Sequence, residues 1–384
     1  MSKKIKVMQL VWRLSTGGAE RMVVNFHNSL KDNPQIEVRT LSFTPQSNDL
    51  YESQIVKDSS VVFIPKHFSE KLPSVIGKAV RKLVYPKFRK KWLISQVDEF
   101  SPDILHIHLA GIAAEMYDVC RKLPKSIKII YHLHSMPEAI GDDRRRIIRQ
   151  AVEEKVYTPL CVTQLQRESA VSFYGIDENA YIVYNGIDIK PFLECEMTDS
   201  DKQELKNSLG IDEDALVVGC VGRGEAIKNY PKLAAAVGEL SKSRKTAFLV
   251  VGKISKELES EIRDKAQNAT VVLTGQRSDT NRLYRIMDVF ALASFYESSS
   301  IVTVEAQLSG VPCVISDRIS DEVTISDAVM KCSPDASEKE WAERIAQSAG
   351  KTAVLSENYR RFDFNESVKE LIQIYNAMAG KNND

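Results

Sequence analysis

The chain has 384 residues, of which 43% are hydrophobic and 27% are charged, and its formal net charge at pH 7 is zero. This composition is typical of a globular enzyme-sized protein, and the balanced charge excludes the basic signature of a nucleic-acid-binding protein. The length fits two domains of about 150 to 200 residues. The apolar runs are shorter than the roughly 20 residues that a membrane-spanning helix needs, and the N-terminus does not fit a signal peptide.

Short apolar segments alternate with longer amphipathic ones, which is typical of doubly wound parallel sheets, and this alternation occurs twice. An Asn185-Gly186 turn and the polar acidic stretch after it, to about residue 209, predict a hinge between the halves. Ligands of such sheets bind beyond the carboxyl ends of the strands, so the expected site is the cleft between two Rossmann-like domains. The expected strands lie at residues 5–11, 37–43, 60–64, 104–108, 128–132, 160–163, 215–221, 247–252, 270–274, 289–293 and 312–315.

A glycine pair, Gly17-Gly18, follows the first expected strand. Glycines at a strand-to-helix turn let the backbone come close to a bound phosphate or sugar. The segment has neither the G-x-G-x-x-G spacing of dinucleotide folds nor the G-K-[ST] ending of a P-loop, so hydride transfer and nucleotide hydrolysis are disfavoured. The alternative is a glycine turn that serves only to reverse the chain.

Residues 66–91 form a local basic patch, with nine Lys or Arg against one acid, Glu70. Apolar residues are interleaved with the basic ones, as in amphipathic surfaces that lie on anionic lipid, where each basic side chain contributes about 1 kcal/mol. The pattern predicts contact with an anionic membrane surface through the Lys66–Lys91 region. The alternative is an ordinary solvated helix face.

Four of the six histidines form two H-x-H pairs, His106 with His108 and His132 with His134, each at the end of an expected strand. Alternation along a strand puts both members of a pair on one face. A metal site is one interpretation, but no cysteine or clustered acid joins the pairs, and we expect no metal. We predict instead that they are polar site residues at the cleft, with His134 the best placed.

The second half opens with Gly222-Arg223 and, shortly after, Lys228, in the loop that follows an expected strand. Two cations so placed can neutralise a diphosphate. A unit charge at about 4 Å contributes about 4 kcal/mol at an effective dielectric of 20, before desolvation, which is enough to replace a metal ion. The alternative is that both are ordinary surface residues.

Two carboxylates, Glu297 and Glu305, lie eight residues apart around an expected helix start between two strands. Three serines at 298–300 occupy the N-cap region, and Gly310 lies where the helix should end. The N–H groups and the positive dipole end of such a helix suit a diphosphate. Glu297 in the loop can accept hydrogen bonds from sugar hydroxyls, and Glu305 can hold a ribose diol. The alternative is two surface glutamates on an ordinary crossover helix.

Together these pieces resemble the retaining glycosyltransferases of GT-B fold, glycosyltransferase family 4, in the branch that makes bacterial capsular polysaccharides and exopolysaccharides. They occur in the order of the family and cover most of the chain. The matching pieces are Gly17-Gly18-Ala19-Glu20-Arg21, His132-Leu133-His134-Ser135, Asn185-Gly186-Ile187-Asp188, Gly222-Arg223 with Lys228-Asn229, Gly275-Gln276-Arg277, and Glu297 to Pro312 with Ser316-Asp317.

The resemblance implies that Gly18 approaches the diphosphate of the donor and that Arg223 and Lys228 bind it. Glu305 would hold the ribose, and Glu297 would contact the transferred sugar. The implied catalytic residues are His134, which lines the reacting centre, Glu297, Arg223 and Lys228. The implied substrate-binding residues are Gly17, Gly18, His108, Arg223, Lys228, Ser299, Ser300, Ile301, Val302 and Glu305.

The resemblance also implies retention of the anomeric configuration without a metal or another cofactor, by same-face attack in which the leaving phosphate helps to deprotonate the acceptor. The D-x-D motif of metal-dependent sugar transferases is matched by Asp212-Glu213-Asp214, which we interpret as solvated charge. Two departures stand out. Glu297 is followed by three serines where the family has Glu-Gly-x-Pro, which changes the flexibility of the loop and can alter donor choice. Gly224 replaces a bulky apolar residue, which either widens the nucleotide pocket or has little effect.

The fold class that follows is α/β, GT-B: two facing Rossmann-like domains with doubly wound parallel sheets and a C-terminal helix that returns to the first domain. We expect an acceptor-binding domain at residues 1–188, a nucleotide-sugar-binding domain at 189–362 and the crossover helix at 363–384. Domain closure would then be a hinge motion.

We therefore predict transfer of a sugar from a nucleotide-sugar donor, a UDP-sugar or alternatively a GDP-sugar. The expected acceptor is a lipid-linked saccharide or an oligosaccharide, in the synthesis of a bacterial capsule, exopolysaccharide or surface glycan. The six cysteines include no C-x-x-C pair, so we interpret them as reduced residues of a cytoplasmic protein, peripheral at the inner face of the plasma membrane. The alternatives are a nucleotide-sugar epimerase or phosphorylase on the same fold, and a non-catalytic nucleotide-sugar-binding scaffold subunit.

Overall fold

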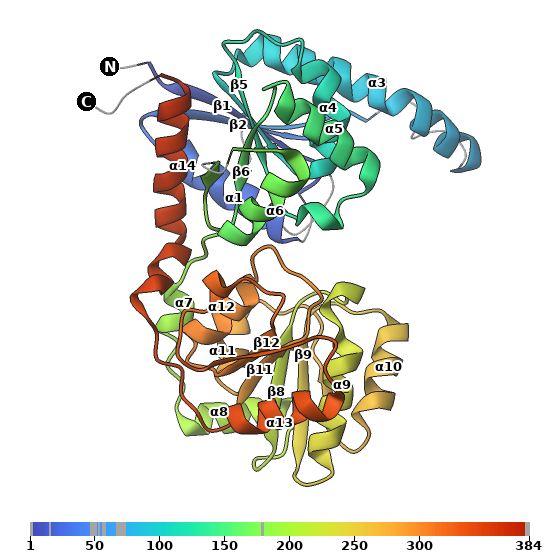
Figure 1. Ribbon diagram of the computed structural model, residues 1–384, viewed down its shortest axis with the longest axis vertical. Helices are drawn as coiled ribbons and strands as arrows, with labels where there is room; N and C mark the ends of the chain where they lie inside the picture. Colours follow the sequence, from blue (N-terminus) through green and yellow to red (C-terminus); the bar gives the residue numbers. More distant parts are fainter. Residues whose placement is uncertain are drawn as a thin grey trace. The chain divides into compact units, whose positions relative to one another are not determined.

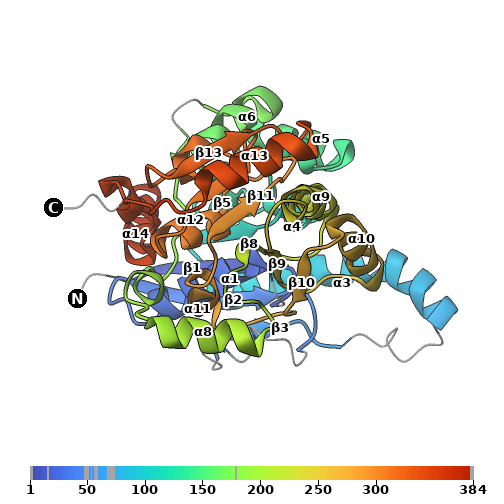
Figure 2. The ribbon, with the colours of Figure 1, turned by 90° about the horizontal axis from the view of Figure 1, so that it is seen from below.

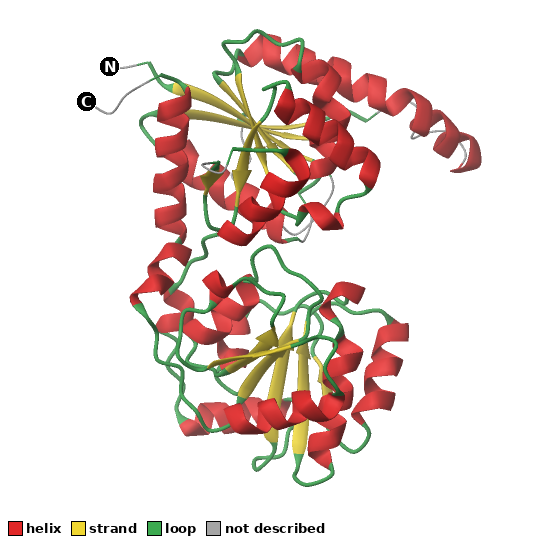
Figure 3. Cartoon of the chain, viewed as in Figure 1, coloured by secondary structure: helices red, strands yellow, loops and turns green. Residues whose placement is uncertain are grey.

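The computed structural model describes residues 3–14, 17–46, 52, 54–55, 59–66, 74–177 and 180–380. The chain divides into two compact units. Unit 1 consists of the residues up to Asn185 and those from Asn365 onward, and unit 2 of Gly186–Phe364. In each unit, helices flank a sheet of parallel strands (Figure 1, Figure 3). The predicted α/β class with two parallel sheets is therefore confirmed.

Within the described residues, unit 1 has a seven-stranded sheet in the order β3-β2-β1-β4-β5-β6-β7. All neighbouring strands in it are parallel. The order reverses between β1 and β4, and ligands of open sheets bind outside the carboxyl ends of the strands at such a point. The strands are β1 (Ile5–Val11), β2 (Ile36–Ser42), β3 (Val61–Phe63), β4 (Ile104–His108), β5 (Lys128–His132), β6 (Thr158–Cys161) and β7 (Tyr181–Ile182).

The helices of unit 1 cover this sheet with apolar faces. In α1, Phe26 and Leu30 lie four residues apart, so they share one face of the helix, and both are fully buried. In α14, Leu371 and Tyr375 repeat this spacing and are buried as well. Within the described residues, the α-helices of unit 1 are α1 (Gly18–Lys31), α3 (Ser74–Phe100), α4 (Ala110–Cys120), α5 (Asp142–Glu153), α6 (Gln164–Tyr174) and α14 (Phe364–Met378).

Within the described residues, unit 2 has a six-stranded parallel sheet in the order β10-β9-β8-β11-β12-β13. Every residue of β8 and β9 is buried, which explains their continuous apolar sequences. The strand order reverses between β8 and β11, which marks the carboxyl edge there as the expected ligand site. The strands are β8 (Leu216–Val221), β9 (Thr246–Val251), β10 (Thr270–Leu273), β11 (Val289–Leu292), β12 (Cys313–Ser316) and β13 (Val329–Cys332).

The helices of unit 2 include three that begin with a side-chain cap. Thr198 forms a capping box with Asp201, and Ser255 and Ser337 each accept a hydrogen bond from the backbone of the first turn. Helix α9 packs against both α10 and α13 (Figure 2). The helices are α7 (Lys190–Leu193), α8 (Asp199–Ser208), α9 (Tyr230–Ser241), α10 (Lys256–Ala266), α11 (Thr280–Tyr284), α12 (Ile301–Leu308) and α13 (Glu338–Ser348).

Two features of the chain differ from the sequence pattern. Much of the stretch predicted as a hinge is helical, because α7 and α8 occupy 190–193 and 199–208. The strands β7 and β13 were not indicated by the pattern. Both lie at a sheet edge and are mostly only partly buried or exposed, so they lack the apolar run of a central strand.

The predicted basic patch falls largely on α3, which contains Pro86. Residues 67–73 of the patch, and all side chains from 67 to 83, lie outside the described residues. Among the described basic residues of the patch, Arg89 is bound to Glu115 of α4 through two hydrogen bonds of 2.7 and 2.9 Å. Its guanidinium also lies 4.8 Å from the ring centroid of Trp12. Arg89 therefore holds α3 to the core of unit 1. The helices of the described part of the chain include none that is long and apolar enough to cross a membrane.

Candidate functional site

Loops after β8, β9 and β10 are joined backbone to backbone at the carboxyl edge of the sheet of unit 2. Gly222 N donates to Val251 O, and Gly252 N donates to Gly275 O, each at 2.9 Å. A Cβ on Gly252 would lie 1.9 Å from the carbonyl oxygen of Gly222, and Gly252 has a φ of +141°. Glycine is therefore required at this approach. The contact fixes the start of the segment that carries Arg223 and Lys228.

Lys228 and Glu297 form an ion pair beyond this edge. Lys228 Nζ lies 2.6 Å from Glu297 Oε1, and the two side chains are only 14% and 16% exposed. Ser294 Oγ donates to the same carboxylate oxygen at 2.9 Å. Phe295 N donates to Ile227 O at 2.9 Å, which joins the two loops through their backbones. The structure thus brings together two of the predicted site residues, and neither is an ordinary surface residue.

Arg223 lies apart from that pair. Its guanidinium is 2.9 Å from Glu225 Oε1, and the two side chains are 59% and 49% exposed. An exposed ion pair of this kind contributes about 0 to 1 kcal/mol. Arg223 can therefore leave Glu225 for an anionic ligand at little energetic cost.

Glu305, on α12, is only 4% exposed. Tyr284 Oη, at the end of α11, donates to Glu305 Oε2 at 3.0 Å and lies 3.2 Å from Val302 O. Burial, and then the neighbouring carboxylate, raise the pKa of Tyr284 well above its usual value, so its hydroxyl stays protonated as a donor. Glu305 is therefore a buried carboxylate held in a fixed orientation, and the interpretation as a surface glutamate does not apply to it.

Ser300 occupies the N-cap position of α12, as predicted, but its side chain does not make the capping bond. Its Oγ lies 2.9 Å from Thr303 Oγ1, and the residue is 1% exposed. Ser299, Ile301 and Val302 surround this helix start and are each partly exposed. Of these predicted substrate-binding residues, Ser300 is the one that faces the protein interior.

The space beside Gly224 is already filled. A Cβ on Gly224 would lie 2.9 Å from Ile254 Cα, from Ile254 Cγ2 and from Leu258 Cδ2. Side chains from the segment after β9 thus take the volume that a bulky residue would use. Between the two predicted consequences of this glycine, the packing disfavours a wider pocket.

In unit 1, Gly17 and Gly18 form the start of α1, the helix that follows β1 in the chain. Gly17 is the N-cap residue with extended backbone. A Cβ on Gly18 would have no described atom within 4 Å, so the backbone there is open to a ligand. Residues 15 and 16, which precede the pair, lie outside the described residues.

The four histidines of the two H-x-H pairs form one cluster. His106 Nε2 lies 3.2 Å from His132 Nδ1, and His108 Nδ1 lies 2.9 Å from His134 Nε2. The rings of His106 and His108 stack with centroids 4.2 Å apart, and the rings of His132 and His134 have centroids 4.3 Å apart and are tilted by 34°. The first three histidines are fully buried and His134 is half-buried. The structure thus places His108 and His134 together, at the carboxyl ends of β4 and β5.

All four rings are neutral near pH 7. Burial is the largest cause that lowers the pKa of each, and it brings the pKa of His134 to about 4. Neutral imidazoles bind metals, and ligand atoms of His106, His108 and His132 lie within 4.8 Å of one another. Both nitrogens of His106 and both nitrogens of His108 already lie within hydrogen-bonding distance of other side chains, however. A metal ion would therefore have to replace some of these bonds.

The D-x-D-like segment lies at the other end of the sheet of unit 2, just before β8. Asp212 and Asp214 lie 3.6 and 3.0 Å from Lys245 Nζ, and their side chains are 64% and 68% exposed. This agrees with their interpretation as solvated charge. It also places them at the amino edge, away from the loops that follow β8 and β11.

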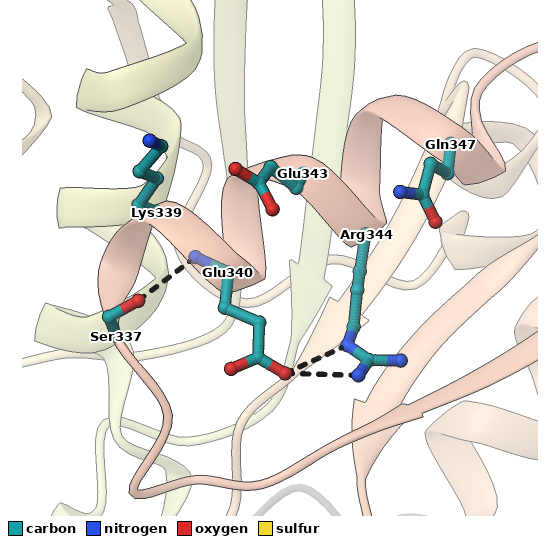
Figure 4. A pocket seen from close by; sticks show the side chains of 6 residues that line it. All are labelled: Ser337, Lys339, Glu340, Glu343, Arg344 and Gln347. Atoms are coloured by element: carbon teal, nitrogen blue, oxygen red, sulfur yellow. Dashed lines mark hydrogen bonds and ion pairs between the residues drawn. The ribbon is translucent and has the colours of Figure 1, made fainter.

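A pocket of about 460 Å³ lies on the outer surface of α13, and its labelled side chains all come from this helix and its N-cap (Figure 4). Glu340 in it pairs with Arg344 at 3.0 Å, one turn along the helix. Its lining contains none of the predicted site residues. We therefore assign this pocket no part in the candidate site.

Sequence patterns did not identify four residues that hold the candidate site residues in place. Tyr284 and Ser294 orient the two carboxylates in unit 2, while Gln9 and Tyr375 bond to the outer nitrogens of His108 and His106 at 3.2 and 2.6 Å. A polar Gln9 inside the apolar strand β1 is a signal that could have been used. Tyr284 and Tyr375 carry no comparable signal, because a buried tyrosine is common in any core.

Two family descriptions match the chain. Residues 16–190 match Glycosyltransferase Family 4, and residues 201–370 match glycosyl transferases group 1. Among known proteins, "Putative glycosyltransferase EpsF" of Bacillus subtilis (strain 168) is 27% identical over 401 residues, which cover 100% of this chain and 99% of that protein. The UDP-Gal:alpha-D-GlcNAc-diphosphoundecaprenol alpha-1,3-galactosyltransferase of Escherichia coli is 24% identical over 239 residues, which cover 56% of this chain and 58% of that protein.

Similar solved structures share the fold over nearly the whole chain. Anabaena HepE in complex with UDP and glucose has a TM-score of 0.76 at 18% identity, covering 97% of this chain and 100% of that one. A glycosyltransferase from Rickettsia africae ESF-5 has a TM-score of 0.78 at 17% identity, covering 99% and 100%. These likenesses, with the two parallel sheets, confirm the predicted GT-B fold.

Proposed function

Because this chain belongs to glycosyltransferase family 4 and has the GT-B fold, we propose that it transfers a sugar from a nucleotide-sugar donor to an acceptor hydroxyl with retention of configuration. A UDP-sugar is the proposed donor, with a GDP-sugar as the alternative. Support comes from HepE, whose solved structures hold UDP, and from the E. coli relative, whose name specifies UDP-Gal.

The observation that carries this proposal is the arrangement at the carboxyl edge of unit 2. A shielded Lys228 stands next to the carboxylate of Glu297, and Glu305 is buried and oriented by Tyr284. Lys228 and Arg223 would bind the diphosphate, and Glu305 would hold the ribose. Glu297 would accept hydrogen bonds from hydroxyls of the sugar. This division matches cations to phosphate and carboxylates to diols, which is the pairing their chemistry favours.

The proposed reaction breaks the bond between the anomeric carbon and the diphosphate oxygen and forms a bond from the acceptor oxygen to the same face of that carbon. The acceptor proton passes to an oxygen of the leaving diphosphate. Lys228 and Arg223 stabilise the negative charge that develops there, with no reorganisation needed for Lys228, which the ion pair already holds in place. In unit 1, Gly18 would approach the diphosphate, and His134, next to His108, would line the reacting centre.

A ligand panel tests the donor. The parent protein is heated with UDP, GDP, ADP, CMP and their common sugars, beside Arg223→Ala/Lys228→Ala and the matched control Lys245→Ala, whose lysine pairs with Asp214 at the amino edge. A ligand at 100 times its dissociation constant adds about 2.7 kcal/mol of stability. We expect one nucleotide class to stabilise the parent and the control but not the double variant. No stabilisation of the parent by any nucleotide would contradict the proposal.

The same panel separates the alternatives when product formation is measured. Sugar release that requires an added acceptor supports transfer, whereas conversion of the donor sugar without an acceptor supports an epimerase. Replacement of Glu297 or Lys228 should strongly reduce turnover by an enzyme. A protein that binds the nucleotide, yields no product and keeps its cellular role in both variants would instead be a scaffold.

For the acceptor, we propose a lipid-linked saccharide or an oligosaccharide at the inner face of the membrane, in synthesis of a capsule, exopolysaccharide or surface glycan. The basic patch at residues 66–91 supports contact with anionic lipid, and half of its basic residues would contribute appreciably at about 1 kcal/mol each. Co-sedimentation with vesicles of anionic or neutral lipid tests this. Binding only to anionic vesicles, lost at high salt, is expected, and equal recovery from both kinds would contradict it.

A further inference from the structure

A chain of hydrogen bonds runs through the core of unit 1 from β2 to the turn that carries His134. Gln9 Nε2 donates to Thr40 Oγ1 at 3.3 Å, and Gln9 Oε1 lies 3.2 Å from His108 Nε2. His108 Nδ1 lies 2.9 Å from His134 Nε2. Gln9, Thr40 and His108 are each 0% exposed, so water does not compete for these bonds. We call these four residues the Gln9 chain.

The amide of Gln9 gives each bond of the Gln9 chain a direction. An amide oxygen only accepts hydrogen bonds, so His108 donates from Nε2. Burial lowers the pKa of His108 well below its usual value, and its ring therefore carries a single proton. Since this proton is on Nε2, Nδ1 of His108 accepts, and His134 donates to it from its own Nε2.

The same donor-to-acceptor direction extends to the hydrogen bonds beyond Thr40. Thr40 Oγ1 accepts from Gln9 and lies 2.8 Å from His27 Nδ1, to which it can donate. His27 Nε2 then donates to Ser60 Oγ, 3.3 Å away. Each hydrogen bond of this series thus pairs one donor with one acceptor, as buried polar groups require.

The consequence for His134 follows from its protonation. Desolvation lowers its pKa to about 4, so near neutral pH the ring carries one proton. With that proton on Nε2, Nδ1 has a lone pair and is an acceptor. A ring with so low a pKa is a weak general base at pH 7, so the chemistry of Nδ1 is that of a hydrogen-bond acceptor rather than of a base.

The opposite pair of histidine tautomers would follow from one change, a rotation of the Gln9 side-chain amide. If the Gln9 amide were turned by 180°, its NH₂ would donate to His108 Nε2. His108 would then donate from Nδ1 to His134 Nε2, and His134 would present an N–H at Nδ1. The tautomers of both histidines therefore depend on the orientation of a single buried amide.

We propose that Gln9 is a positioning residue that fixes the tautomer of His134, so that Nδ1 of His134 accepts a hydrogen bond from a hydroxyl of the bound sugar substrate. This rests on the proposed function, which takes His134 as a residue of the reacting centre. It adds a residue on β1 that touches no substrate, and it assigns His134 the part of an acceptor rather than a donor or a base.

Nitrogen NMR measures the tautomers directly. The full chain is labelled with ¹⁵N at histidine, and the signals of its six histidines are assigned by their loss in single His→Gln variants. At pH 7 the parent protein should show His108 and His134 both protonated at Nε2. Gln9→Leu removes the acceptor and should give His134 a mixed or reversed tautomer. Gln9→Glu keeps an oxygen acceptor toward His108 and should preserve the parent state.

The result that overturns the proposal is a parent spectrum with His134 protonated at Nδ1, or a Gln9→Leu spectrum in which His134 is unchanged. Should Gln9→Leu not fold, the parent and Gln9→Glu spectra still decide. These spectra need no turnover, so the expected tautomers in a protein that transfers no sugar would support the role of Gln9 and count against the proposed function alone.

Kinetics supply the second measurement. Gln9→Leu should lower kcat/KM about tenfold, the effect of one hydrogen bond lost between His134 and the sugar, while the dissociation constant of UDP stays unchanged because Arg223 and Lys228 in unit 2 are untouched. Gln9→Glu should restore most of kcat/KM. An equal loss of kcat/KM in both variants, with the parent tautomer kept, would show that Gln9 acts only through packing.

Discussion

Lys228 and Glu297, 69 residues apart in the sequence, are joined by a 2.6 Å ion pair that is largely shielded from water. The two residues have opposite proposed tasks, since the lysine is to bind the diphosphate and the carboxylate is to bind the sugar. A diphosphate that binds Lys228 must therefore share it with a neighbouring negative charge. This makes the pair a point where affinity for the nucleotide and turnover can be separated.

Glu297→Gln should bind UDP more tightly but transfer sugar more slowly. The amide keeps the shape of the carboxylate and removes its repulsion of the diphosphate. We expect about tenfold tighter binding, roughly 1.4 kcal/mol, which is a fraction of the 4 kcal/mol between unit charges at 4 Å and an effective dielectric of 20. Titration calorimetry with UDP, beside initial rates, measures both effects. Weaker UDP binding by this variant would show that Glu297 serves to orient Lys228 for the phosphate.

Lys228→Ala should destabilise unit 2, because among the described residues it leaves the Glu297 carboxylate, 16% exposed, with the Ser294 hydroxyl as its one remaining side-chain partner. We expect a loss of about 2 kcal/mol, between the cost of a broken hydrogen bond and that of a broken buried ion pair. Urea unfolding followed by tryptophan fluorescence gives the value, with Trp12→Phe and Trp92→Phe as the background so that Trp341, fully buried in unit 2, is the reporter.

The matched control is Lys245→Ala, since Lys245 is 61% exposed in its pair with Asp214. Its free energy of unfolding should change by no more than about 0.5 kcal/mol. Equal losses in the two variants would mean that the shielding of Lys228 and Glu297 adds nothing to their interaction.

The inner strands of both sheets could be predicted from the sequence because helices on both faces force their residues to be apolar. The edge strands β7 and β13 could not, since partial exposure removes that signal. In the same way, Glu297 and Glu305 were visible as a spaced pair, whereas Tyr284, which orients Glu305, was one tyrosine among thirteen.

The histidine cluster could be predicted only in part from the sequence. Each H-x-H pair is visible locally, but the contact between the pairs depends on the register of β4 with β5, in which His108 is opposite His132. The bond from His106 to Tyr375 spans 269 residues. No local pattern carries such information, because it arises only when strands and the C-terminal helix pack together.

Gly224→Leu should lower the melting temperature of unit 2, although a bulky apolar residue is what the resemblance to the family leads one to expect there. The new Cβ would meet the backbone Cα of Ile254 at 2.9 Å, and a backbone atom cannot move away as a side chain can. Overpacking of this kind costs typically about 1 to 3 kcal/mol. Differential scanning calorimetry of the variant measures the change.

A double variant provides the control for Gly224. Adding Leu258→Ala to Gly224→Leu opens part of the space, because Leu258 Cδ2 is also 2.9 Å from the position of the new Cβ. It should recover some of the lost stability, although Leu258→Ala alone is expected to be neutral or destabilising. If Gly224→Leu raises the melting temperature by itself, the loop has room that this packing does not show.

Unit 1 should lose stability as the pH falls below about 6.5. The histidine cluster has lowered pKa values in the folded protein, so in acid the unfolded chain binds protons that the folded chain does not, and the free energy of unfolding decreases. The loss begins at the unfolded value of about 6.5 and, for His134, ends near its folded pKa of about 4. Its share is about 3 kcal/mol at 1.36 kcal/mol per unit of pKa.

Urea unfolding at pH 7, 6 and 5 measures this loss, with Trp341→Phe as the background so that the remaining tryptophans, Trp12 and Trp92, report on unit 1. His132→Gln removes one titrating ring and should flatten the slope between pH 6.5 and 5. In unit 1, the hydroxyl of Tyr117 holds the pKa of Glu154 below its ordinary value of 4.5, so this carboxylate loses its contribution only below about that pH. A free energy of unfolding that is constant from pH 7 to pH 5 would mean that the histidines take up protons in the folded state, and hence that water reaches them.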